Sequence, residues 1–598
     1  MADTVIRFKD FGFQYKVQQK PTLYDINLEI RKGEKVLILG GSGSGKSTLA
    51  NCINGLIPFS YEGTITGSVE VNGHETKGSS IYKLSKEVGT VLQDSDAQFV
   101  GLSVAEDIAF AMENECIPRS QMVPIVEEHA ATVGMQDFLK AVPFDLSGGQ
   151  KQKVGIAGVL GSNVDILIFD EPLAALDPRM GETAIELIDQ LAQDKERTIV
   201  IIEHRLEDVL HRRVDRIILM SEGRIVADTT PDDILKGTLL QQYGIREPLY
   251  ITAMKYAGCN LEGNDGLSSI DNMVFSDESR ERLLRFFESE VESHEPNPGD
   301  ELVSVKDVSF SYDDSRKVLE DVSFTIRKGE RIAVVGRNGA GKSTAAKLIC
   351  GICRPNKGSI TIDGKDAKGL SIKEIGERVG YVMQNPNQMI VKDTIKNEVE
   401  YALTLRNMPR EQIIARATDA LNACSLFPMR NWPVDTVSYG QKKRITVASI
   451  LVLQPDVIIL DEPSAGQDYR SYTEIMKFLD VLNKEYGKTI VFITHDMHLA
   501  LENTDRAIVF TDGRLLKDDR TFAVLADNDT IEKANLKQTS LYRLAQRLGL
   551  EPERVIRHFI DYENYKGCKG SKPEAMLEDG GPEAVKSVGQ NAKEGEPS

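Results

Sequence analysis

Long apolar runs are missing from this chain. No stretch of its 598 residues approaches the roughly 18 consecutive apolar side chains that a membrane-crossing helix needs. The first residues, MADTVIRFKDFGF, also lack the basic region and apolar run of a secretory signal. With 41% hydrophobic and 27% charged residues, the composition is typical of a globular protein, and we expect the chain to stay in the cytosol.

Cysteine and tryptophan are scarce. The seven cysteines are scattered and odd in number, which indicates free thiols in a reducing compartment rather than a disulfide framework. Cys350 and Cys353 form a C-x-x-C pair without a second pair or a nearby histidine, so we expect packed thiols on one helical turn and no zinc site. The single tryptophan, Trp432, is expected to serve packing.

Basic residues are outnumbered. The chain has 91 Asp and Glu but 72 Lys and Arg, and its formal net charge is -19. Nonspecific binding to nucleic acid depends on clustered positive charge, because the ligand is a row of phosphates. We therefore expect no nucleic-acid partner.

An internal repeat covers most of the chain. A segment of the first half, KVLILGGSGSGKST, corresponds to RIAVVGRNGAGKST in the second half, and Lys46 and Lys342 are separated by 296 residues. Leu249-Tyr250 and Leu541-Tyr542 are 292 residues apart, so the repeat includes a C-terminal extension. Four further pairs share one separation of 291 residues: Gln93 and Gln384, Gln150 and Gln441, Glu171 and Glu462, His204 and His495.

Each half is predicted to be an α/β domain. β-branched runs such as KVLILG and DVIILDE are typical of buried parallel strands, and helical segments lie between them. We predict a first domain at 1–230, an extension and acidic linker with one amphipathic helix at 231–300, and a second domain at 301–525. A helical extension at 526–566 and a disordered tail at 567–598 follow.

Two glycine-rich loops match G-x-x-x-x-G-K-[ST] between a strand and a helical pattern. In such loops backbone N–H groups surround phosphate oxygens, the lysine neutralises β- and γ-phosphate charge, and the serine hydroxyl ligates magnesium. This predicts two sites for ATP with Mg²⁺. The predicted residues are Gly40, Gly41, Ser42, Gly43, Ser44, Gly45, Lys46, Ser47 and Thr48, and Gly336, Arg337, Asn338, Gly339, Ala340, Gly341, Lys342, Ser343 and Thr344.

A pair of acids ends a second apolar strand in each half. Ligands of open α/β sheets gather at the carboxyl ends of the strands. Asp170 and Asp461 are expected to hold magnesium through its water shell. Glu171 and Glu462 are expected to polarise the attacking water, a role worth about 10²- to 10⁴-fold in rate.

Between the loop and the acid pair, the first half reads LSGGQ at 146–150, which is the signature of ATP-binding-cassette (ABC) ATPases. The chain thus resembles two fused P-loop ABC ATPase domains, each with a helical signature subdomain and a small C-terminal extension. In that family the signature caps the γ-phosphate held by the opposite domain. The second half departs from the pattern, because Tyr439 stands where the first half has glycine. The signature residues are Ser147, Gly148, Gly149 and Gln150, and Ser438, Tyr439, Gly440 and Gln441.

The resemblance assigns further roles in both halves. Gln93 and Gln384 resemble the glutamine that touches magnesium and senses the membrane partner, and Asp177 and Asp468 resemble D-loop residues. His204 and His495 resemble the switch histidine that contacts the γ-phosphate and are placed with the catalytic residues. Tyr15 and Tyr312 resemble the aromatic residue that stacks on adenine, although an aromatic on a strand also serves core packing.

The resemblance also implies an intramolecular pseudo-dimer that sandwiches two ATP molecules. One composite site would join the first-half ATP residues around Lys46 to Ser438 and Gly440, and the other would join those around Lys342 to Ser147 and Gly149. Each half would then supply the phosphate loop and the acid pair of one ATP site, and the opposite half would supply the signature of that site.

Within the family, the chain is most similar to ATPases of energy-coupling-factor (ECF) importers. The motifs that carry this similarity are EHRLEDV at 203–209, QNPNQMIV at 384–391, SYGQKKR at 438–444 and DEPSAGQD at 461–468. It implies a transmembrane scaffold subunit, a substrate-capturing membrane subunit, and a peripheral position at the cytoplasmic face of the cell membrane. The alternatives are a fused sugar-importer ATPase and a soluble tandem ABC ATPase of translation.

Overall fold

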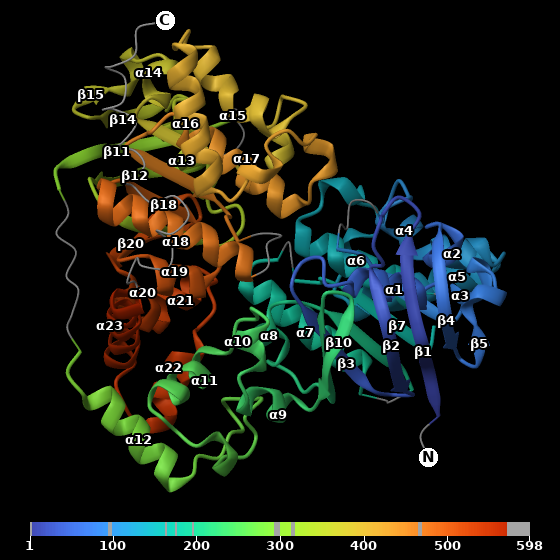
Figure 1. The fold of residues 1–598 in the computed structure, drawn as a ribbon. Helices are drawn as coiled ribbons and strands as arrows, with labels where there is room; N and C mark the ends of the chain where they lie inside the picture. Colours follow the sequence, from blue (N-terminus) through green and yellow to red (C-terminus); the bar gives the residue numbers. More distant parts are fainter. Residues whose placement is uncertain are drawn as a thin grey trace, which may run out of the picture.

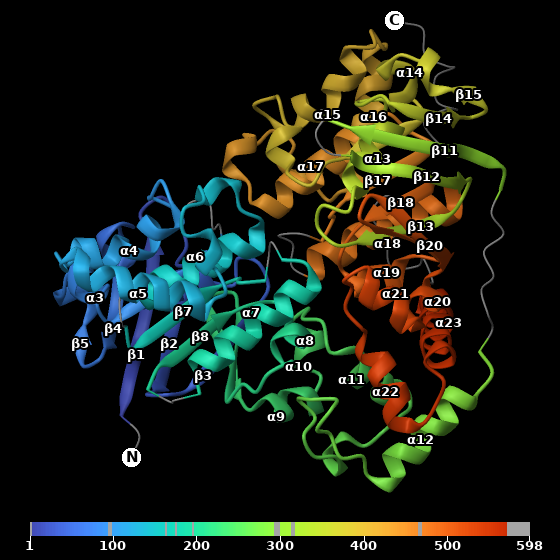
Figure 2. The same cartoon turned by 180° about the vertical axis from the view of Figure 1, so that it is seen from behind.

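The computed structural model describes residues 3–93, 98–161, 164–173, 176–193, 196–291, 299–312, 317–464 and 469–570. Asp468 and the part of the predicted tail from 571 onward lie outside these ranges. Two similar halves lie side by side, and their C-terminal extensions meet below the second half and to the left of the first (Figure 1). The view from behind shows the same arrangement (Figure 2).

In the described residues, each half contains one antiparallel and one mainly parallel sheet. The first antiparallel sheet has the order β2-β1-β4-β5, with β1 (Thr4–Tyr15), β2 (Leu23–Arg31), β4 (Gly63–Val71) and β5 (His74–Glu75). The other has the order β10-β9-β3-β8-β7-β6, with β3 (Lys35–Gly40), β6 (Val88–Val91), β7 (Ile166–Asp170), β8 (Thr198–Ile202), β9 (Arg216–Ser221) and β10 (Arg224–Thr229). Every residue of β3 and β8 is buried, as expected for the centre of a parallel sheet covered on both faces.

The second half repeats both sheets with the same connections. Its antiparallel sheet is β12-β11-β14-β15, with β11 (Glu301–Ser311), β12 (Lys317–Arg327), β14 (Lys357–Ile362) and β15 (Lys365–Asp366). Its larger sheet is β16-β17-β18-β13-β19-β20, with β13 (Arg331–Gly336), β16 (Val379–Val382), β17 (Val457–Asp461), β18 (Thr489–Ile493), β19 (Arg506–Thr511) and β20 (Arg514–Arg520). The duplicated architecture confirms the predicted α/β class.

Helices connect the strands in matching positions. A helix follows each glycine loop, α1 (Lys46–Ile53) and α13 (Lys342–Ile349). The helical subdomains contain α4 (Val104–Asn114), α5 (Arg119–Thr132) and α6 (Gly148–Leu160), and α15 (Ile395–Thr404), α16 (Arg410–Ala423) and α17 (Tyr439–Leu451). After the acid pairs come α7 (Pro178–Leu191) and α18 (Tyr469–Tyr486), and after the switch histidines α8 (Leu206–Val209) and α19 (Met497–Asn503). Three short helices are α2 (Leu56–Phe59), α3 (Ile81–Leu84) and α14 (Ile372–Gly376).

The C-terminal extensions of the two halves pack against each other. The first contains α9 (Pro231–Lys236), α10 (Leu239–Gln242), α11 (Leu249–Tyr256) and α12 (Asp277–Glu288), and the second α20 (Thr521–Ala526), α21 (Asn528–Lys533), α22 (Ser540–Leu548) and α23 (Pro552–Gly570). Helix α12 is the amphipathic helix of the acidic segment, and it buries Leu283 and Phe287 against α23. The ring of Phe286 lies 4.7 Å from that of His558, between centroids.

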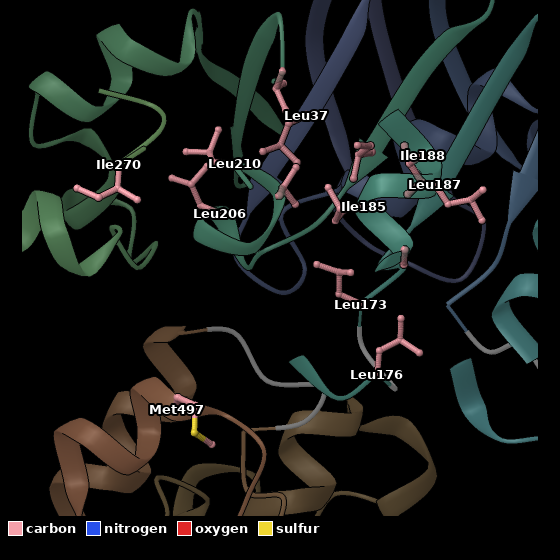
Figure 3. Close-up of a cluster of buried hydrophobic side chains, with 14 of the residues drawn as sticks. Leu37, Leu173, Leu176, Ile185, Leu187, Ile188, Leu206, Leu210, Ile270 and Met497 are labelled. Atoms are coloured by element: carbon pink, nitrogen blue, oxygen red, sulfur yellow. The ribbon is translucent and has the colours of Figure 1, made fainter. Parts of the chain in front are cut away.

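One hydrophobic core therefore runs through both halves. It joins Leu37 and Ile188 of the first half to Ile270 of its extension and to Met497 of the second half. Figure 3 shows Met497 on the second half, across from Leu173 and Leu206 of the first. Burial of apolar surface is the dominant favourable term in association, so this shared core holds the two halves together.

Two packing predictions need correction. Trp432 is 51% exposed, so the expectation that it packs in the interior is wrong. Cys350 is buried, but α13 ends at Ile349 and Cys353 lies beyond its end, so the pair does not form one turn of a helix. Burial raises the pKa of Cys350 to about 12, which keeps this thiol protonated and unreactive.

Candidate functional site

In each glycine loop, the lysine ammonium donates to two backbone carbonyl oxygens of the same loop. The Nζ atom of Lys46 donates to the carbonyl oxygens of Gly40 and Gly41 at 2.8 and 2.9 Å. In the second half, Lys342 donates to Gly336 at 2.6 Å and Arg337 at 3.0 Å. Gly45 has a φ of 100°, where a side chain would be strained, and a Cβ there would lie 2.7 Å from Leu23.

A tyrosine lies beside each loop. The Tyr15 and Thr48 hydroxyls are 3.2 Å apart, and the Tyr312 and Thr344 hydroxyls are 3.3 Å apart. Tyr312 is 58% exposed, so its ring is available to a planar ligand rather than lost in the core.

Both catalytic glutamate candidates adopt left-handed backbone geometry. Glu171 has a φ of 48° and Glu462 a φ of 47°. The N–H of each glutamate donates to the end of the neighbouring strand, to Ile202 and Ile493, at 2.9 Å. Non-glycine residues in this region cost energy and cluster at functional sites. The sheet thus fixes each glutamate next to the histidine that follows that strand.

Each aspartate of the acid pairs lies near the loop serine. Ser47 Oγ donates to Asp170 Oδ1 at 3.4 Å. Burial and the charge of Glu171 raise the pKa of Asp170 to about 6. A bound cation would compensate this crowded negative charge, and hydroxyl and carboxylate oxygens are the donors that Mg²⁺ prefers. The residues present therefore fit a magnesium ion that is shared with phosphate oxygens.

The two sites differ around their histidines. His495 Nδ1 lies 2.7 Å from Glu462 Oε1, within hydrogen-bond distance. His204 Nδ1 lies 3.9 Å from Glu171 Oε1 and closer, at 3.2 Å, to the buried Glu203. Glu171 instead accepts a hydrogen bond of 2.6 Å from the Gln93 side chain.

The signature serines cap the helices that follow them. Ser147 is the N-cap of α6 and Ser438 is the N-cap of α17, each in a capping box with the glutamine three residues later. Both serines are exposed at the start of a helix, where the dipole and free N–H groups favour anions.

A cleft of about 2160 Å³ brings residues of both halves together. From the first half it is lined by the glycine loop with Lys46, by Glu171 and by His204. From the second half it is lined by Tyr439 and Gly440. Ser438 is not among the residues that line it.

A first-half residue also acts on the loop of the second half. Burial lowers the pKa of Lys342, while the charges of Glu462, Asp461 and the first-half residue Asp177 act against this effect. Asp177 therefore lies within electrostatic reach of the loop of the other half.

Sequence reasoning missed two residues at the second acid pair. Tyr381 donates from its hydroxyl to Asp461 Oδ2 at 2.7 Å, and the first half has Thr90 at that position of the repeat. Lys443 is 1% exposed and donates to the carbonyl oxygens of Gln384, Asp461 and Glu462 at 2.7, 3.2 and 3.0 Å. The sequence does contain an indication of this lysine's role, because the two halves differ at its position of the repeat, where the first half has Gln152.

Comparison with known proteins identifies the repeated domains. A family model described as ABC transporter matches residues 23–174 and 319–465, and a model described as ATP-binding cassette cobalt transporter matches residues 237–310. A protein of Clostridium perfringens named as an ABC transporter ATP-binding protein is 53% identical over 560 residues, which cover 94% of this chain and 98% of that protein. A protein of the same name from Enterococcus faecalis is 52% identical and covers 94% of this chain and 99% of its own length.

A solved structure, that of cbiO1 from Clostridium perfringens, described as part of the ABC transporter complex cbiONQ, is 32% identical. It covers 41% of this chain and 99% of its own, with a TM-score of 0.37.

Proposed function

The chain belongs to the ATP-binding proteins of ABC transporters, whose ATP hydrolysis is coupled to transport, and we propose that it powers an importer of the energy-coupling-factor type. The cargo would be a small molecule such as a vitamin, a vitamin precursor or a metal ion. The observation that carries this proposal is the match of residues 237–310 to a model described as ATP-binding cassette cobalt transporter. Within this range, Leu249, Leu267 and Leu283 of the first extension lie in the core shared by both halves.

We propose that the two halves act as an intramolecular pseudo-dimer with two composite ATP sites. The first would join Lys46, Asp170, Glu171 and His204 to Ser438 and Gly440, and the second Lys342, Asp461, Glu462 and His495 to Ser147 and Gly149. The cleft that Lys46 shares with Gly440 supports this arrangement. ATP would close the pair because its γ-phosphate bridges both halves, and hydrolysis would remove that bridge.

Within each site we propose a separate role for each side chain. The loop lysine binds phosphate, Glu171 or Glu462 accepts the proton of the attacking water, and His204 or His495 orients the γ-phosphate. Mg²⁺, when bound, would neutralise charge on the β- and γ-phosphates. The residues proposed to hold it are Ser47, Gln93 and Asp170, and Ser343, Gln384 and Asp461.

Tyr439 of the second half lines the cleft of the first site, and its replacement tests the composite arrangement. Its hydroxyl donates to the Gln384 carbonyl at 3.3 Å, and Tyr439 lines the cleft that Lys46 also lines. Tyr439→Gly gives the second signature the glycine that the first signature has at this position. We expect this variant to raise ATP turnover by roughly fivefold or less, the factor that corresponds to the free energy of one hydrogen bond. The reciprocal Gly148→Tyr variant should lower turnover. An effect of the same sign in both variants would contradict composite sites.

The proposed partners are a transmembrane scaffold and a substrate-capturing membrane protein, with this chain peripheral at the cytoplasmic face. Across the described ranges, the helices are too short or too polar to span a bilayer. Leu102 is 82% exposed in the segment between β6 and α4, the segment of the chain that also contains Gln93. We propose that a scaffold helix docks on this segment.

Purification from membranes in mild detergent tests the importer proposal. We expect two membrane proteins to co-purify with the chain and Leu102→Asp to reduce their recovery by at least about tenfold. Ile81→Asp is the matched control, because Ile81 is also an exposed apolar residue, at 42%, but belongs to α3 and not to the segment between β6 and α4. Co-purification with ribosomes or DNA in place of membrane proteins would overturn the proposal.

A further inference from the structure

The backbone carbonyl of Gln384 accepts hydrogen bonds from two side chains of helix α17. The Lys443 ammonium donates to it at 2.7 Å and the Tyr439 hydroxyl at 3.3 Å. A carbonyl oxygen has two lone pairs, so it can accept both bonds. The two donors are four residues apart and therefore lie on the same face of the helix. The first turns of α17 are thus attached to the glutamine that is proposed to touch the magnesium ion of the second ATP site.

Lys443 also attaches α17 to the second acid pair. Its ammonium donates to the carbonyl oxygens of Asp461 and Glu462 at 3.2 and 3.0 Å. The N–H of Glu462 donates to the Ile493 carbonyl at 2.9 Å, so the peptide units on both sides of this glutamate are held. Lys443 is 1% exposed, and hydrogen bonds from a charged donor are stronger where water is excluded. The position of the Glu462 backbone therefore depends on the position of α17.

The same helix begins at the signature of the second half. Ser438 is its N-cap, and Gly440 lines the cleft that Lys46 of the first site also lines. Lys443 lies only about 7 to 8 Å further along the helix axis than Ser438, a length over which an α-helix is stiff. A shift of this signature toward nucleotide in the first site would therefore also move the contacts with Gln384 and with the second acid pair.

The first half lacks both of these side chains. At the positions of Tyr439 and Lys443 it has Gly148 and Gln152. Gln152 donates to the carbonyl of Pro172, the residue after the acid pair. Since the first half forms the same sheets and the matching helix α6 with these residues, the architecture alone does not require a tyrosine and a lysine here. This difference favours a role that is specific to the second half.

We propose that Tyr439 and Lys443 are positioning residues that couple the two ATP sites. They make the geometry of Gln384 and Glu462 at the second site depend on the signature that covers the nucleotide at the first. The inference rests on the proposed composite sites and adds a route between them. Its consequence is that the second site hydrolyses ATP faster when the first site is occupied. Because coupling of binding is reciprocal, nucleotide at the second site changes affinity at the first by the same factor.

Two variants of the full-length chain set the state of the first site. Glu171→Gln is expected to keep ATP bound there without hydrolysis, and Lys46→Ala to leave that site empty. Phosphate release at saturating ATP and Mg²⁺ then comes from the second site in both backgrounds. We define the occupancy ratio as turnover with Glu171→Gln divided by turnover with Lys46→Ala. We expect a ratio of at least about five, the lower end of typical couplings between sites.

Loss of the contacts made by Tyr439 and Lys443 should lower this occupancy ratio. Tyr439→Phe keeps the ring at the first site and removes only the hydroxyl, and Lys443→Gln introduces the residue of the first half. We expect each substitution, added to both backgrounds, to lower the ratio by at least about twofold, the factor that corresponds to one weak hydrogen bond. A purely structural role would lower turnover in both backgrounds alike and leave the ratio unchanged. Tyr439 is 40% exposed, so Tyr439→Phe keeps the test informative if Lys443→Gln folds poorly.

Matched controls remove the same chemical groups elsewhere in the second half. Tyr486→Phe and Lys373→Gln change exposed residues of α18 and α14, and we expect neither to alter the ratio. The proposed coupling is overturned if the ratio is above one and neither Tyr439→Phe nor Lys443→Gln lowers it.

The starting value of the occupancy ratio separates this coupling from the composite sites on which it rests. A ratio of one before Tyr439 or Lys443 is changed would overturn both, because each site would then work alone. The measurements use the purified chain and need no membrane partner. Failure of the importer proposal would therefore leave them unchanged.

Discussion

Replacing Glu462 with glutamine is expected to lower ATP turnover by at least about 100-fold, because the amide is isosteric but cannot accept the proton of the attacking water. The backbone of Glu462 is held by Ile493, and its carboxylate lies 2.7 Å from His495 Nδ1. The site of Glu462 is also the one that the LSGGQ signature would complete. ATP binding should persist, because the glycine loop and Lys342 are unchanged.

Glu171→Gln is the companion variant. Glu171 is held by Gln93 rather than by the switch histidine, and its site would be completed by the signature that contains Tyr439. We therefore expect the same direction with a smaller loss. The measurement is phosphate release at saturating ATP and Mg²⁺, beside nucleotide binding. Glu411→Gln, on the exposed face of α16, should change nothing, and unchanged turnover in both active-site variants would refute the catalytic assignment.

The parts of the site made of consecutive residues could be predicted from the sequence. A glycine loop fixes its own geometry, because the positions of Gly40 through Ser47 are set by local backbone conformation between one strand and one helix. The same holds for the signature caps, in which Ser438 and Gln441 are three residues apart and bond to each other's backbone.

The features that depend on distant segments could not be predicted in this way. No local pattern brings Arg246 to Glu502 or joins Met497 to the core of the first half, because these contacts depend on how the extensions fold back. Residue type alone predicts that Trp432 packs, but this side chain is exposed because the segment before the second signature runs over the surface. The different distances from each histidine to its glutamate likewise follow from Glu203 standing where the second half has Thr494.

Loss of the buried ammonium of Lys443 is expected to be the most destabilising change near the second site. Its three bonds tie α17 to the carbonyl of Gln384 and to the carbonyls of Asp461 and Glu462. Burial lowers the pKa of Lys443 to about 8, yet carbonyl oxygens on three sides still provide acceptors for its protons. Lys443→Met would leave those buried acceptors without a donor, at a cost of about 3 kcal/mol in the free energy of unfolding.

Lys443→Gln tests whether stability depends on a hydrogen-bond donor at this position or on the lysine itself. In the first half Gln152 occupies this position and donates to the Pro172 carbonyl, so glutamine has a precedent in the same fold. We expect it to recover about half of the stability lost with methionine, measured by urea unfolding. The ammonium of Lys442 donates to the exposed Asn387 side chain at 3.2 Å, and Lys442→Met should cost less than about 0.5 kcal/mol. Equal losses for Lys442→Met and Lys443→Met would show that the three carbonyls do not depend on Lys443.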